Sequence, residues 1–184
     1  MACCGNNCRS RTRQTQVRVY NQNNFIPSVI EVFNPTTQTI VSQQDISFSQ
    51  TNYNTGVSFS SRLDNLGADI VATGVYKITF TGIVEAESAL VAGFAITLNG
   101  EPLPQSEIFQ VVSESGPQTV FTTTIFKVIS PSANIGVANI GNESFNLLNA
   151  KLEIVRVGNF WKTHNSQKPI HRFGIFFQKY SSFV

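Results

Sequence analysis

Charged residues and long apolar runs are scarce in this chain of 184 residues. Charged residues make up 13%, about half the share that is usual in soluble proteins. No apolar run reaches the roughly 18 residues of a membrane-spanning helix. No apolar segment follows the first arginines, so the sequence predicts no secretory signal peptide. We therefore expect no membrane partner.

The residue patterns of common enzyme sites are also missing. Both histidines, His164 and His171, lie near the C-terminus, and neither a G-x-S-x-G motif nor a glycine-rich phosphate loop occurs. Glu85 and Glu87 are expected to share one face near a turn, which favours a solvated or ion-binding loop over an acid–base pair. The sequence therefore predicts no enzyme, no catalytic residue, no cofactor and no metal site.

Cysteine is absent after residue 8, because Cys3, Cys4 and Cys8 are the only three in the chain. A disulfide that stabilises a fold joins distant segments, and thiols gathered at one end cannot do so. Disulfides to other molecules are the favoured interpretation. Two alternatives stay open: inert thiols, and an incomplete zinc site that several chains would have to complete.

Charge is distributed unevenly along the chain. The ends contain basic residues and no acid, whereas the middle contains all 11 acidic residues. Either end is therefore expected to be attracted to the body of a neighbouring copy, or else to remain solvated. The basic residues are Arg9, Arg11, Arg13 and Arg18 at the start, Arg62, Lys77, Lys127, Lys151 and Arg156 in the middle, and Lys162, Lys168, Arg172 and Lys179 at the end.

Residues 1–43 are interpreted as a cysteine-bearing connector arm. Residues 28–33 have the composition of a strand, and a turn is expected at Asn34-Pro35. A lone extended strand needs a sheet edge to pair with, which predicts docking on a neighbouring molecule. The docking candidates are the apolar residues Phe25, Ile26, Val29, Ile30 and Phe33.

Residues 44–158 are expected to form one domain of many short strands. In 75–82, Tyr76, Ile78 and Phe80 alternate with polar residues, and Asn99-Gly100 indicates a tight hairpin. Strands are predicted at 45–49, 57–60, 69–71, 75–82, 90–98, 108–112, 119–128, 134–139 and 150–157. This spacing favours an all-β antiparallel sandwich.

Residues 159–184 are interpreted as a basic, aromatic C-terminal extension. They contain Phe160, Phe173 and Trp161, the only tryptophan of the chain. Aromatic and basic residues together can stack on nucleic acid bases, but no base-binding module surrounds them, so no nucleic acid partner is predicted. A strand at 170–177 that packs on its own domain or on another subunit is favoured, and a shifted reading frame is a further alternative.

Several motifs of the middle segment resemble the C-terminal domain of BclA, the collagen-like glycoprotein of the Bacillus exosporium. They are residues 73–79 (Thr-Gly-Val-Tyr-Lys-Ile-Thr), 98–104 (Leu-Asn-Gly-Glu-Pro-Leu-Pro), 130–132 (Ser-Pro-Ser) and the strand at 150–157. The resemblance implies a jelly roll like that of tumour necrosis factor and the complement heads. It also implies a homotrimer whose three-fold interface draws on 75–82 and 134–139.

The arrangement of an arm before a jelly roll, without a Gly-X-Y tract, resembles the subunits of F-type Bacillus endospore appendages. This resemblance implies a structural subunit of a spore-surface fibre or exosporium layer, released by mother-cell lysis. Its partners would be copies of itself and other spore-surface proteins, with Cys3, Cys4 and Cys8 crosslinking the joints. The alternative function is a trimeric tip or adhesin-type recognition head that its arm anchors to the spore.

Overall fold

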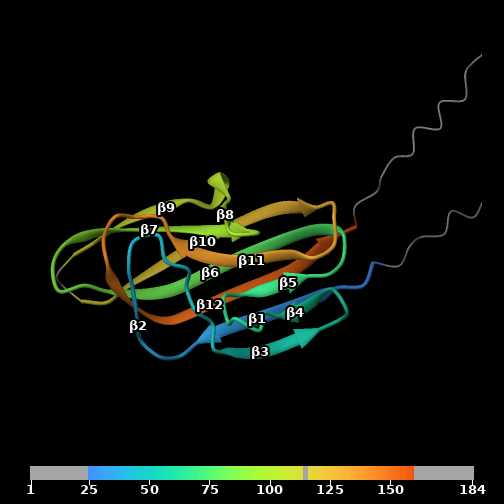
Figure 1. The fold of residues 1–184 in the computed structure, drawn as a ribbon, viewed down its shortest axis with the longest axis horizontal. Helices are drawn as coiled ribbons and strands as arrows, with labels where there is room; N and C mark the ends of the chain where they lie inside the picture. Colours follow the sequence, from blue (N-terminus) through green and yellow to red (C-terminus); the bar gives the residue numbers. More distant parts are fainter. Residues whose placement is uncertain (1–24, 114–115, 160–184) are drawn as a thin grey trace, which may run out of the picture.

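The computed structural model describes residues 25–113 and 116–159. The described part is almost entirely β-structure (Figure 1). The strands are β1 (Ser28–Asn34), β2 (Gln38–Ile40), β3 (Gln50–Thr55), β4 (Phe59–Ser61), β5 (Ala68–Ile70), β6 (Gly74–Glu85), β7 (Leu90–Leu98), β8 (Glu101–Pro102), β9 (Ile108–Val112), β10 (Gln118–Val128), β11 (Ala133–Asn139) and β12 (Phe145–Gly158). One 3-10 turn, η1 (Pro104–Ser106), precedes β9.

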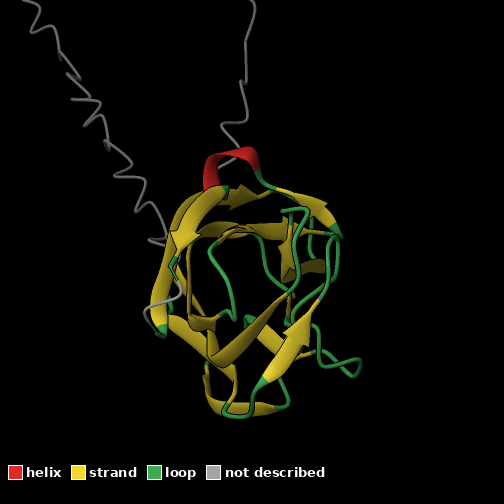
Figure 2. Ribbon diagram, turned by 90° about the vertical axis from the view of Figure 1, so that its left-hand side faces the viewer, coloured by secondary structure: helices red, strands yellow, loops and turns green. Residues whose placement is uncertain are grey.

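The strands form two six-stranded sheets with antiparallel pairing throughout. The first has the order β10-β6-β12-β1-β3, with β2 beside β12, and the second has the order β4-β5-β11-β7-β8, with β9 beside β7. Figure 2, viewed from one end, shows the two sheets facing each other across the core. The predicted all-β jelly-roll sandwich is confirmed.

Aromatic side chains join the two sheets in the core. Phe80 of β6 lies 5.4 Å from Phe94 of β7, and Phe94 lies 5.1 Å from Phe145 of β12, measured between ring centroids. The alternation predicted for β6 is confirmed, since Tyr76, Ile78 and Phe80 are fully buried and Lys77 is exposed. Burying such rings supplies a large share of the hydrophobic stabilisation of a small sandwich.

The predicted arm is too long in this structure. Residues Ser28–Asn34 form β1, which pairs with β12 on one side and with β3 on the other. Ile30 and Val32 of β1 are buried in the chain's own core. The backbone of β1 is therefore hydrogen-bonded on both sides within its own chain. Residues 28–43 belong to the jelly-roll domain, which we call the head.

Two of the predicted strands differ markedly from the structure. Residues 45–49 form no strand, and only an isolated bridge joins Asp45 to Ala138. The last strand begins at Phe145 and not at 150, because a register shift between Leu148 and Lys151 lets pairing with β6 continue. A bulge of this kind interrupts the alternation on which the sequence pattern depends.

The hairpin at Asn99-Gly100 is confirmed between β7 and β8. Asn99 has φ 54° and Gly100 has φ 87°, so both central residues adopt the left-handed conformation. Leu98 pairs with Glu101 directly across the turn. This is the geometry that an Asn-Gly pair favours in a two-residue hairpin loop.

Gly67→Ala is expected to destabilise the head by about 3 kcal/mol or more, because the strain of a positive φ and the steric clash of the added methyl group both oppose folding. Gly67 has φ 138°, and an added Cβ would lie 1.9 Å from the carbonyl oxygen of Ile135. Gly100→Ala is the matched control: its φ is 87°, but no atom lies within 4 Å of the added Cβ. The control should cost about 1 kcal/mol. Urea unfolding measures both, and equal losses would contradict the steric argument.

Candidate self-association surface

The first sheet turns one side to the core and the other outward, and we call the outward side the open face. Along β6 and β10, every second side chain points away from the core and lies on this face. The strand register aligns them in rows across the sheet. From β10 to β3, the rows are Ile125, Lys77, Val155, Val29 and Thr55, then Thr123, Thr79, Glu153, Glu31 and Tyr53, and then Phe121, Thr81, Lys151 and Phe33.

Strand β10 forms one edge of the open face and exposes large apolar side chains. Phe121 is 55% exposed and Ile125 is 64% exposed. Further along their rows, Phe33, Val29 and Val155 are half-buried. The outer face of an antiparallel sheet is normally polar, so large apolar side chains exposed on its edge strand mark a candidate interaction surface.

A polar network within one chain surrounds Glu31 and Glu153 of the middle row. The Glu31 carboxylate accepts hydrogen bonds from Asn52 Nδ2 at 2.8 Å and Tyr53 Oη at 3.3 Å, and Lys151 Nζ lies 3.3 Å from it. Tyr53 also donates to Glu153 at 2.9 Å. Since Glu31 and Glu153 are directly opposite on neighbouring strands, Tyr53 and Lys151 offset the repulsion between their carboxylates.

Burial raises the pKa of Tyr53, and its hydrogen bond to Glu153 and the charges of Glu153 and Glu31 raise it further. The neutral phenol has a single O–H proton, so Glu153 at 2.9 Å is its main acceptor and Glu31 at 3.3 Å is a weaker second one. Glu31 is 6% exposed and makes several bonds, so its charge is already solvated by the protein. A partner could cover the network without leaving this carboxylate unpaired.

The predicted docking residues do not lie on one surface. Ile30 is in the core, Val29 and Phe33 lie half-buried on the open face, and Phe25 and Ile26 lie exposed before β1. The prediction that these residues dock together on a neighbour is therefore wrong for Ile30, whose side chain packs inside its own head. Cys3, Cys4 and Cys8 lie outside the described residues.

The two segments expected at the three-fold interface lie in different sheets. Residues 75–82 belong to β6 of the first sheet, and residues 134–139 belong to β11 of the second. Only β6 contributes to the open face. Phe121 and Ile125 are not among the residues predicted for the interface, although the period of two in 119–128 places them together on the side opposite Val120.

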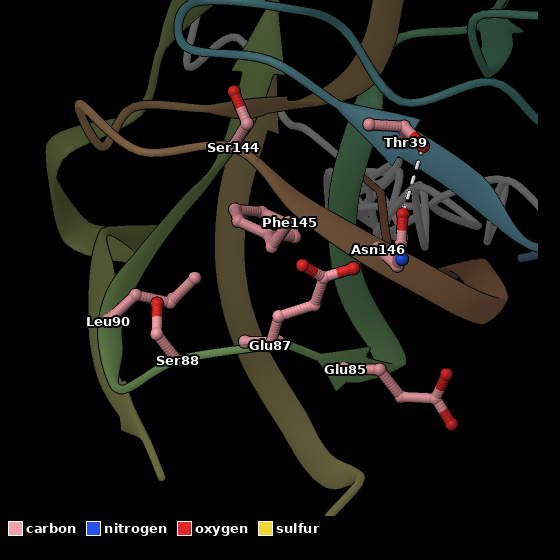
Figure 3. A pocket seen from close by; sticks show the side chains of 9 residues that line it. Thr39, Glu85, Glu87, Ser88, Leu90, Ser144, Phe145 and Asn146 are labelled. Atoms are coloured by element: carbon pink, nitrogen blue, oxygen red, sulfur yellow. Dashed lines mark hydrogen bonds between the residues drawn. The ribbon is translucent and has the colours of Figure 1, made fainter. Parts of the chain in front are cut away.

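Glu85 and Glu87 line a pocket of about 250 Å³ with Ser88, Phe145 and Asn146. Figure 3 shows the Glu87 carboxylate directed towards Phe145 and that of Glu85 directed away. The expectation that both share one face is wrong, because β6 ends at Glu85 and Glu87 lies in the following bend. Among the described residues, no group of three acidic, His or Cys side chains is placed to hold a metal ion.

A larger cleft of about 400 Å³ has mostly polar walls. Asp45 and Arg62 line it together with Thr97, Asn99 and Asn134, and Leu66 is the only large apolar contributor. Asn99 Oδ1 accepts a hydrogen bond from the backbone N–H of Asn134 at 2.8 Å, which holds two of these residues together. Amide, hydroxyl, carboxylate and guanidinium groups are the usual partners of polar ligands such as sugars.

No helix in the described part of the chain is long and apolar enough to cross a membrane.

No protein-family model matches the sequence, and neither does any curated protein. Solved structures match the fold. Murine APRIL at pH 5.0 has a TM-score of 0.56 at 13% identity, over 72% of this chain and 100% of that one. The globular domain of zebrafish complement 1qA protein has the same score and identity, over 72% and 99%. The Eiger TNF of S. frugiperda has a TM-score of 0.53 at 9% identity, over 76% and 96%.

At these identities the likeness establishes the fold alone. It agrees with the resemblance of the middle segment to tumour necrosis factor and complement heads, while kinship with BclA and with endospore appendages stays a prediction. The chain therefore has the jelly-roll sandwich of TNF-like and complement 1q-like heads.

Proposed function

We propose that this chain is a non-enzymatic structural subunit that forms homotrimers through its open face and joins neighbouring trimers through its N-terminal segment. The observation that carries the proposal is the exposure of Phe121 and Ile125 on β10, the edge strand of the open face. Large side chains of this kind gain free energy when a partner removes them from water.

The proposed contact is between two different parts of the open face. The β10 edge of one copy, with Phe121 and Ile125, packs on the rows around Phe33 and Val155 of the next copy. Contacts between unlike surfaces close into a ring when the rotation between copies allows it, and three copies form a trimer. Because the Glu31 carboxylate already contacts Asn52 and Lys151 of its own chain, a neighbouring copy covers the middle row at a low desolvation cost.

Phe121→Asp combined with Ile125→Asp is expected to convert trimers to monomers. Each of the two apolar side chains contributes about 2 kcal/mol when it is buried in the contact, so the double substitution raises the dissociation constant of each contact about 1000-fold. Light scattering after size exclusion measures the mass. Leu63→Asp with Val91→Asp is the matched control, because both side chains are exposed and belong to the second sheet, Leu63 in the loop between β4 and β5 and Val91 on β7. A trimeric Phe121/Ile125 variant, or a parent chain that is monomeric at every concentration, would contradict the proposal.

The joint between trimers is proposed to be the segment before β1, with Cys3, Cys4 and Cys8 forming disulfides to a neighbouring copy. The start of β1 and the end of β12 lie at the same end of the head, because Ser28 pairs with Arg156 (Figure 1). A segment that leaves from one end can reach the free end of the next head. The proposed location of such a fibre or layer is the spore surface, with other spore-surface proteins as its neighbours.

The polar cleft favours a second candidate function, a trimeric recognition head that its N-terminal segment anchors to the spore. Asp45, Arg62 and Asn134 offer charged and amide groups to a glycan or a protein ligand. Electron microscopy of the oxidised protein discriminates between the two functions. A fibre subunit forms long filaments, whereas a tip needs one joint and stops at trimers.

A further inference from the structure

Exposed apolar side chains gather at the end of the sandwich where β1 begins and β12 ends. Val57 is 77% exposed and Ile129 is 62% exposed, and four others are exposed to a lesser extent. We call this set the end patch, and its members are Phe25, Ile26, Val57, Val71, Ile129 and Val157.

Contacts between the loops show that these residues share one end of the head. Val71 N–H donates to the carbonyl oxygen of Ser58, which follows Val57, at 2.9 Å. Ser58 Oγ donates to Ser28 Oγ at 3.1 Å, which brings the Val57 loop to the start of β1. Val128, which precedes Ile129, pairs with Gly74 at the start of β6.

Arg156 of β12 joins the loops at this end. Its guanidinium donates to the carbonyl oxygen of Thr73 at 2.9 Å and to Asn159 Oδ1 at 3.0 Å, and it lies 6.0 Å from the centre of the Phe25 ring. Its Nε is buried without a hydrogen-bond partner. A guanidinium next to apolar side chains is a favourable neighbour for further aromatic rings.

We propose that the chain's own C-terminal segment, residues 160–184, covers the end patch. The segment begins where the patch lies, since Asn159 is bonded to Arg156 and Val157 belongs to the patch. No linker has to be spanned, so the effective concentration of the segment at the patch is high. The inference does not depend on trimer formation, because every contact lies within one chain.

Composition favours the C-terminal segment over the N-terminal one. Between residues 9 and 24, Val17, Val19 and Tyr20 are the only large apolar residues, and the rest are mainly Arg, Asn, Gln and Thr. The C-terminal segment contains the aromatic residues Phe160, Trp161, Phe173, Phe176, Phe177, Tyr180 and Phe183. Aromatic rings bury the largest apolar area per residue, which is the kind of contact that the end patch offers.

Trp161 is the only tryptophan, so its fluorescence reports on this segment in the full-length protein. We expect emission at shorter wavelength than in the urea-unfolded chain, and protection from quenching by acrylamide. Val57→Ser combined with Ile129→Ser should abolish both effects without unfolding the head, because both side chains point into solvent in the head itself. Val91→Ser combined with Val111→Ser, on paired strands of the second sheet, is the matched control and should leave both effects unchanged.

Dilution and the position of the emission distinguish the possible occupants. A shift that persists at every protein concentration, and in a chain lacking residues 1–24, supports docking within one chain. A shift that disappears on dilution assigns the patch to a second copy and overturns the inference. Emission of the parent protein at the wavelength of the unfolded chain overturns the inference as well. So does a Val57/Ile129 variant that keeps the emission and quenching of the parent while its near-ultraviolet circular dichroism shows a folded head.

Discussion

Deleting residues 1–43 is expected to unfold the head, whereas deleting residues 1–24 leaves it folded. The longer deletion removes β1, whose backbone bonds to both β12 and β3, and β2, which pairs with β12. It also removes the buried side chains of Ile30, Val32 and Ile40. Each buried side chain contributes about 2 kcal/mol. Together with the lost strand pairing, the free energy lost on deletion approaches the whole stability of a typical domain.

Circular dichroism and urea unfolding of both truncated chains test this expectation. The shorter deletion removes only residues before Phe25 and is the matched control, because the described strands stay complete. A cooperative unfolding transition after the longer deletion would mean that β1 is not an integral strand of its own head. In that case Ser28–Asn34 would be free to pair with a neighbouring molecule, as the sequence pattern alone suggested.

Replacing Cys3, Cys4 and Cys8 together with Ser is expected to remove all assemblies that survive boiling in detergent under oxidising conditions. In our proposal, these thiols supply the covalent joints between heads, which make the polymer resistant to dissociation on any practical timescale. The heads themselves should keep their urea midpoint, because residues 25–113 and 116–159 contain no cysteine.

Gel electrophoresis without reductant, followed by electron microscopy, measures this loss. The parent protein treated with reductant is the control and should behave like the triple variant. Equal resistance of the parent and the triple variant to heat and detergent would exclude the crosslinks. Filaments that are weaker but still present in the triple variant would assign the non-covalent part of the joint to another segment of the chain.

Local patterns account for the elements that the sequence analysis predicted correctly. The strands at 90–98 and 108–112 coincide with β7 and β9, and the alternation in β6 matches the burial of Tyr76 and Phe80. Strand β3 was missed because Gln50–Thr55 is polar and lies almost wholly exposed beside β1. It is a strand because of its neighbour and not because of its own composition.

Residue order, composition and spacing by themselves determined that this chain is an all-β sandwich with its thiols at one end, because alternation and turn residues act over a few neighbours along the chain. Only the tertiary structure decided that β1 pairs within its own head, and that Phe121, Phe33 and Val155 share the open face. These relations depend on strand order and register between segments far apart in sequence, which local pattern leaves open.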